Sequence, residues 1–211
     1  GDVNGDGALD LVITGFDANG DRTATLYLGD GTGGFTGVQA GLTGVSGGSS
    51  SLGDINGDGA FDLVITGDDE NFDPSATVYL GDGDGGFTDA QAGLTGVRHS
   101  SSSLGDVNGD GNLDLVITGF GANGRTATLY LGDGTGGFTD AQAGLASVVN
   151  SSSSLGDVNG DGALDLVITG FDANGDRTAT LYLGDGTGGF TDAQAGLTGV
   201  GRGSSSLGDV D

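Results

Sequence analysis

Oxygen-bearing side chains alternate with small residues in the first ten positions, where Asp2, Asn4 and Asp6 are followed by Asp10. A loop that wraps around a hard cation uses this spacing: alternate side chains supply oxygens, a glycine at the sixth position permits a sharp bend, and a backbone carbonyl fills the seventh. Asn-Gly and Asp-Gly are also the commonest dipeptides of tight hairpin turns. One copy of this stretch therefore leaves a metal loop and an acidic turn both open.

The pattern Asp-x-Asn-x-Asp-Gly-x-x-Asp occurs four times, which favours the metal loop because a turn needs only two of these residues. Donors that are all oxygen, with no Cys or His in the loops, indicate Ca²⁺ rather than zinc or copper. The sequence therefore predicts about four Ca²⁺ ions, one per repeat. The predicted ligands, with the seventh position contributing its carbonyl, are Asp2, Asn4, Asp6, Ala8 and Asp10; Asp54, Asn56, Asp58, Ala60 and Asp62; Asp106, Asn108, Asp110, Asn112 and Asp114; and Asp157, Asn159, Asp161, Ala163 and Asp165.

The spacing of these loops indicates a repeat architecture. Their leading aspartates, with a fifth at Asp209, follow one another at steps of 52, 52, 51 and 52 residues. A fixed period in this range is typical of solenoids, propellers or arrays. We expect one repeat domain over 1–211, with units at about 1–52, 53–104, 105–155 and 156–207, and with 208–211 starting a fifth unit or closing the first.

Each unit is patterned as four short strands. Residues 9–14 are apolar almost throughout, as expected of a strand buried on both faces. Residues 22–31 alternate, 33–42 follow a glycine-rich turn, and the serine-rich run at 49–55 suits a crowded innermost strand. Four strands cannot cover two apolar faces alone, whereas copies stacked side by side can. The predicted fold is all-β, with four tandem four-stranded antiparallel repeats of the β-propeller type.

The ends of the repeat pattern leave closure open. The first unit lacks its serine-rich strand, and residues 204–211 supply one in excess. In a closed ring this strand would complete the first blade, whereas in an open array it would pair with the next chain and propagate a fibre.

Composition excludes several classes of function. A formal net charge of -25, with five Arg and no Lys, excludes a protein that binds nucleic acid or anionic membranes through its charge. No apolar stretch is long enough for membrane insertion. A single His, no Cys and no base–nucleophile pair within a unit predict a protein that is not an enzyme.

GDVNGDGALDLVITG followed by LYLGDGTGGFT resembles the FG-GAP/VCBS repeat of integrin-like β-propellers, and the resemblance covers all four units. It implies that each repeat is a four-stranded blade whose aspartate loop, between the first two strands, binds Ca²⁺ on one face of the propeller. We accordingly expect an extracellular, calcium-stabilised module with a structural or adhesive role, filament-forming if its end strands pair between chains. Its partners would then be copies of itself, or an extracellular protein or glycan.

Other loops are weaker candidates. A second Asp-x-Asn-x-Asp at 17–21 lacks the following glycine and is interpreted as a hairpin turn. The residues before each serine run differ between units and include scarce basic groups. The resemblance places these loops opposite the Ca²⁺ loops, where they could contact a partner or form the sugar pockets of a lectin, the alternative function; drift in tolerant loops explains them equally well. The residues concerned are Arg98, His99, Asn150 and Arg202.

Overall fold

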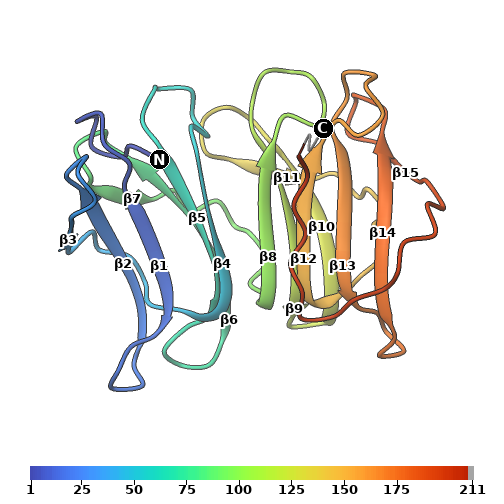
Figure 1. Cartoon of the computed structure of the whole chain (residues 1–211), viewed down its shortest axis with the longest axis horizontal. Coiled ribbons are helices and arrows are strands. Elements are labelled where there is room, and N and C mark those ends of the chain that lie inside the picture. Colours follow the sequence, from blue (N-terminus) through green and yellow to red (C-terminus); the bar gives the residue numbers. More distant parts are fainter. Residues whose placement is uncertain (209–211) are drawn as a thin grey trace.

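The structure, a computed structural model, describes residues 1–208 and contains only β-strands as regular elements. These residues include no helix that could span a membrane. Four antiparallel sheets follow one another along the chain (Figure 1). The predicted all-β fold with propeller-type blades is confirmed.

The sheets repeat one strand order, with the first sheet one strand short. The first sheet contains β1 (Leu11–Phe16), β2 (Arg22–Gly29) and β3 (Phe35–Val38). The second contains β4 (Ser46–Gly53), β5 (Asp62–Asp68), β6 (Pro74–Gly81) and β7 (Phe87–Asp89). The third contains β8 (Arg98–Gly105), β9 (Asp114–Gly121), β10 (Gly124–Gly132) and β11 (Phe138–Asp140). The fourth contains β12 (Val149–Gly156), β13 (Asp165–Phe171), β14 (Arg177–Gly184) and β15 (Phe190–Asp192).

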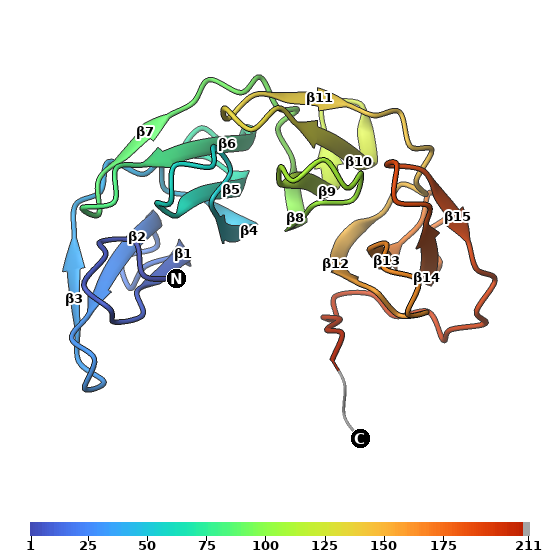
Figure 2. The same cartoon turned by 90° about the horizontal axis from the view of Figure 1, so that it is seen from above.

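The four sheets stand side by side in an open arc (Figure 2). The serine-rich strands β4, β8 and β12 line its concave side, and the short strands β3, β7, β11 and β15 lie on its convex side. The first and fourth sheets occupy opposite ends of the arc, so residues 1–208 form no closed ring.

Each complete sheet takes its innermost strand from the preceding sequence unit. In the second sheet, for example, β4 pairs with β5 so that Leu52 lies opposite Leu63 and Gly53 opposite Asp62. Residues 204–208 have the sequence SSSLG, identical to 49–53, and lie against β12 through hydrogen bonds of Ser205. The remaining part of the predicted fifth unit, including Asp209, lies outside the described residues.

The core lies between the sheets. At the junction of the second and third sheets, Val64 and Val78 pack with Leu115 and Ile117, and all four side chains are buried. Equivalent clusters fill the other two junctions. Burial on both faces, predicted for the strand after each aspartate loop, is therefore confirmed for β5 and β9. On β1, one face is exposed.

Serine hydroxyl groups connect neighbouring innermost strands. The hydroxyl groups of Ser51 and Ser102 are 2.7 Å apart, as are those of Ser103 and Ser153. The small side chains thus permit close approach of these strands and also bond across each junction, because a buried hydroxyl needs a partner.

We predict that Leu63→Ala will lower the free energy of unfolding by about 2–5 kcal/mol, because it empties a fully buried site. Leu11 occupies the same repeat position but is partly exposed on β1. In dilute protein, Leu11→Ala should cost less than about 1 kcal/mol. Urea denaturation of both variants measures the difference, and equal losses would contradict the packing described for the two sheets.

Thr169 provides a second test, because its buried hydroxyl has no hydrogen-bond partner among residues 1–208. The equivalent Thr66 and Thr118 pair with Ser100 and Ser151 at 2.8 and 2.7 Å. The residue that would serve Thr169 in the same way is Gly203.

We predict that Gly203→Ser will raise the unfolding free energy by about 0.5–1.5 kcal/mol through the new hydrogen bond. There is room for the side chain, since the nearest atom to an added Cβ is a methyl carbon of Val200 at 3.5 Å. The matched variant Gly48→Ser should destabilise, because an added Cβ there would overlap the Thr66 carbonyl oxygen. Thermal melts of both variants decide the point, and a Gly203→Ser variant no more stable than wild type would refute the prediction.

Candidate metal centre

The first aspartate of each loop holds the loop backbone in a tight wrap. In the first unit, the amide N–H groups of Asp6 and Gly7 donate to the two carboxylate oxygens of Asp2, at 3.2 and 2.9 Å. Gly5 and Gly7 have φ values of 70° and 85°, a left-handed conformation that glycine adopts without a steric cost. The glycines of the pattern are thus required by the shape of the loop.

The third and fifth positions bring further oxygens to the same loop. The Asn4 amide lies 2.9 Å from an oxygen of Asp6, whose other oxygen accepts the N–H of Ala8 at 2.8 Å. The other three loops repeat the contact between the third and fifth side chains at 2.8 to 2.9 Å. The structure therefore brings together the residues predicted at positions one, three and five, on one edge of every sheet (Figure 1).

The aspartate at position nine is buried, unlike the others. The carboxylate of Asp114 accepts the N–H of Val107 at 2.8 Å through one oxygen and that of Gly132 at 2.9 Å through the other. It therefore ties the start of the loop to the end of β10. The equivalent aspartates make the same pair of bonds in the other units; these residues are Asp10, Asp62 and Asp165.

The carboxyl groups within one loop differ in acidity. Hydrogen bonds from the Asn112 N–H and then from the Asn108 side chain lower the pKa of Asp110. Burial raises the pKa of Asp114, and the neighbouring negative charge of Asp110 adds to that effect. The second unit shows the same contrast between Asp58 and Asp62. The two carboxylates are thus close enough to repel each other.

The donor set of each loop fits a hard cation. Positions one and five supply carboxylates and position three supplies an amide oxygen, the donors that Ca²⁺ takes. Within residues 1–208 no group of three or more His, Cys, Asp and Glu side chains is arranged to hold a metal ion. This agrees with the bonds of the position-nine aspartate to backbone N–H groups. Calcium binding at these loops, and the roles of position nine and of the position-seven carbonyl in it, stay predictions.

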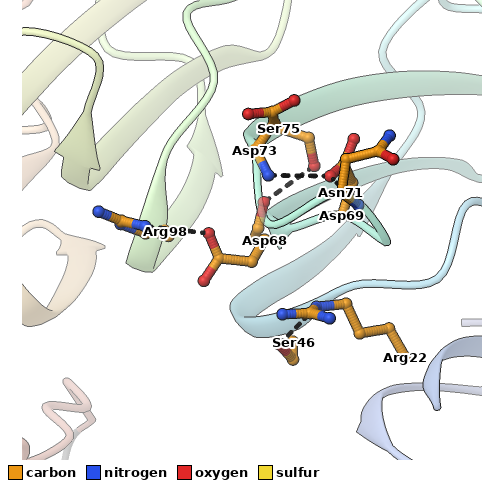
Figure 3. Close-up of polar contacts among 9 residues, drawn as sticks. Arg22, Ser46, Asp68, Asp69, Asn71, Asp73, Ser75 and Arg98 are labelled. Atoms are coloured by element: carbon orange, nitrogen blue, oxygen red, sulfur yellow. Dashed lines mark hydrogen bonds and ion pairs between the residues drawn. The ribbon is translucent and has the colours of Figure 1, made fainter.

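The Asp-x-Asn-x-Asp segment at 17–21 is a hairpin turn between β1 and β2, as predicted. One oxygen of Asp17 accepts the N–H groups of Asn19 and Asp21 at 2.8 and 2.9 Å. The same bonds form between Asp69, Asn71 and Asp73 in the second sheet (Figure 3). These turns lie at the opposite edge of the arc from the aspartate loops.

The variable residues proposed as ligand contacts lie where the innermost strands begin, with Arg98 and His99 in β8, Asn150 in β12 and Arg202 just before the segment 204–208. His99, Asn150 and Arg202 all have left-handed φ values, of 48°, 49° and 59°. Register shifts at Arg98/Ser101 and Val149/Ser152 mark β-bulges at this level of the sheets. The N–H of Arg202 donates to the carbonyl of Asn150 at 3.0 Å.

Two arginines make contacts within the protein at this edge. Arg98 lies 3.7 Å from Asp68 (Figure 3). Its guanidinium group also stacks over the ring of Phe120. Arg22 stacks over Phe72, with its guanidinium carbon 4.0 Å from the ring centroid. Arg98 and Phe120 are paired on β8 and β9 of one sheet, whereas the contacts of Arg98 with Asp68 and of Arg22 with Phe72 join neighbouring sheets. Sequence reasoning missed the contacts between sheets, because the hairpin turns differ in sequence from unit to unit.

In every complete sheet the strands follow one another from the concave to the convex side of the arc (Figure 2), and all the aspartate loops lie at one edge (Figure 1). This arrangement defines the chain as a repeat protein built from β-propeller-type blades. The family model of the FG-GAP-like repeat matches residues 2–65, 54–117 and 106–168, each match starting at the first aspartate of a loop and running into the next unit. The chain belongs to this family. A search of curated proteins finds no match.

We predict that Asp114→Asn will lower the free energy of unfolding by about 1–3 kcal/mol, measured in chelator so that metal loss does not contribute. An amide has only one acceptor oxygen, so the N–H of Val107 or of Gly132 loses its partner. Asp140→Asn is the control, since exposed Asp140 accepts one backbone N–H from Gln142 and an amide oxygen can replace it. Denaturant curves on which the two variants coincide would be incompatible with a structural role for Asp114.

Proposed function

We propose that this repeat module is extracellular, stabilised by about four Ca²⁺ ions, structural or adhesive in role and non-catalytic. The observation that carries the proposal is the fourfold loop, in which two carboxylates and an amide gather at an exposed edge while a buried aspartate fastens the loop to its sheet. FG-GAP-like repeats are typical of extracellular proteins and generally lack enzymatic activity.

Calcium would stabilise the fold by relieving repulsion among fixed negative charges. The chain carries a formal net charge of -25, and each loop holds carboxylates close together. Such self-repulsion destabilises a compact state. A divalent cation bound by the first, third and fifth positions would neutralise the loop that the position-nine aspartate attaches to the core. Ion binding and the folding of the first hairpin of each blade are then coupled.

The structural role is favoured over a lectin by the state of the variable residues. Arg98, the most prominent basic candidate for a sugar contact, is engaged by Asp68 and Phe120. The apolar and aromatic side chains of β5 and β6, including Tyr79, are packed into the junctions between sheets.

We predict that a chelator will lower the melting temperature. Extracellular modules bind Ca²⁺ with dissociation constants of roughly 10⁻⁴–10⁻³ M. At a tenfold excess over such a constant, each site adds about 1.4 kcal/mol, or about 6 kcal/mol for four. Calorimetry with Ca²⁺ and with excess chelator tests this, with Mg²⁺ as the control ion. A melting temperature that is the same in both buffers overturns the calcium proposal.

The fourth unit offers a matched pair of variants that locates the ions. Replacing Asp157 and Asp161 by Asn should reduce the Ca²⁺ stoichiometry by one in isothermal titration. Replacing Asp172 and Asp176 by Asn makes the same change of charge in the hairpin turn at the opposite edge of the same sheet and should leave the stoichiometry unchanged. Loss of a site in the second variant, or in neither, would place the ions elsewhere.

A further inference from the structure

The outward face of the first sheet carries the residues that other sheets bury. Leu11 and Ile13 are 42% and 48% exposed, whereas the equivalent Leu115 and Ile117 of β9 are 0% and 1% exposed beneath the second sheet. Together with Tyr27 of β2, they form what we call the head face. It repeats the half of the junction that Leu166, Ile168 and Tyr182 form in the fourth sheet.

The outward face of the fourth sheet carries the other half of the same junction. Val158, Leu197 and Val200, which we call the tail face, are 43%, 46% and 40% exposed. Their equivalents in the third sheet are 2%, 8% and 2% exposed and pack against the fourth sheet; they are Val107, Leu145 and Val148. A cavity of about 690 Å³ beside this face is lined by Val158, Leu155 and Leu207.

One hydrogen bond between sheets recurs at each of the three junctions. Its acceptor and its donor also occur on the first and fourth sheets, where residues 1–208 offer neither of them a partner of this series. Tyr79, Tyr130 and Tyr182 each accept a backbone N–H from the sheet before them, at 3.0, 3.2 and 3.0 Å. The donors are Thr43, Thr95 and Ala146. The next donor in this series is Thr198, and the acceptor that precedes the series is Tyr27 of the head face.

The innermost strands show the same complementarity between the two ends of the arc. β1 has only β2 as a partner among the described residues, whereas β5, β9 and β13 each have two. Residues 204–208 already lie beside β12 through Ser205, as β12 lies beside β8 through Ser153. The register of β4 on β5 transfers directly to 204–208 on β1. It places Leu207 opposite Leu11, Ser205 opposite Ile13 and Ser204 opposite Thr14.

We propose that two copies of this chain associate head to tail, with the tail face of one packed on the head face of the other. The segment 204–208 of the first copy then adds as a strand to β1 of the second and completes its three-stranded sheet. The partner is a second copy because the two faces are the two halves of one junction, which the chain already makes three times within itself. This inference does not depend on calcium binding.

The contact joins two different faces, so a pair held by one contact still has one free head face and one free tail face. If these two faces also meet, the eight sheets of the pair close a ring, and eight is within the range of 4–8 blades found in propellers. The net charge of -25 on each copy opposes the approach, so association should strengthen as salt screens it.

The test uses two variants, Ile13→Asp in the head face and Leu197→Asp in the tail face. Both sites are exposed, so each variant should fold, as far-UV circular dichroism checks. Light scattering coupled to size exclusion, at moderate salt, should give two or more copies for the wild type and one copy for each variant alone. An equimolar mixture should give two copies, because one variant keeps its tail face and the other its head face.

Phe72→Asp is the control, since it removes an exposed apolar residue from the hairpin between β5 and β6, away from both faces, and should leave association unchanged. A wild type that is monomeric at every soluble concentration overturns the proposal, as does a mixture of folded variants that stays monomeric. Each measurement is made with Ca²⁺ and with chelator. A monomer in both buffers, with the melt still sensitive to chelator, refutes head-to-tail association and leaves the calcium proposal standing.

Discussion

The middle strands of this protein carry apolar residues on both faces, and the arrangement of the sheets follows from that constraint. On β9, Leu115 packs toward the second sheet and the adjacent Val116 toward the fourth. A sheet of this kind is unstable in isolation, because both of its apolar faces would then meet water, and a single neighbour covers only one of them. Stability is therefore shared along the array, because the apolar surface that drives folding is buried between the sheets.

Because the space between sheets is apolar, most polar groups lie at the rims of the arc or are hydrogen-bonded in place, the buried hydroxyl of Thr169 being an exception. Serine hydroxyl groups pair along the concave rim, as between Ser51 and Ser102. The acidic loops occupy one edge, where most of their side chains are accessible to solvent. Asp114 is the exception that connects the two regions, since it is buried yet bonds the backbone of its loop and of β10. A change in the loop is thus transmitted to the packed part of the sheet.

Much of the architecture was predictable because period and patterning agree. The fixed spacing of the loops predicts tandem blades, and the continuous apolar run predicts a strand covered on both sides. The use of Asp114 was not predictable, because spacing places a carboxylate near the loop without deciding whether an ion or a backbone N–H takes its oxygens. The left-handed backbone at His99 and Asn150 was also missed, since it accompanies bulges where β8 pairs with β9 and β12 with β13, which the residue pattern does not mark. The tyrosine hydrogen bonds join residues about 36 positions apart and carry no local signal.

Arrays of repeats that remain single usually carry polar outer faces on their terminal repeats, because an apolar end face would otherwise meet water. The sheets at the two ends of this arc have no such substitution. Leu11 and Ile13 are the same residues as Leu63 and Ile65, and Val200 is the same as Val97. Isolated apolar residues are commonly exposed on protein surfaces. Here, however, the exposed residues of the head face and of the tail face occupy the same positions as residues that pack against each other at the junctions within the chain. The end faces are therefore better explained as halves of a contact than as a surface adapted to solvent.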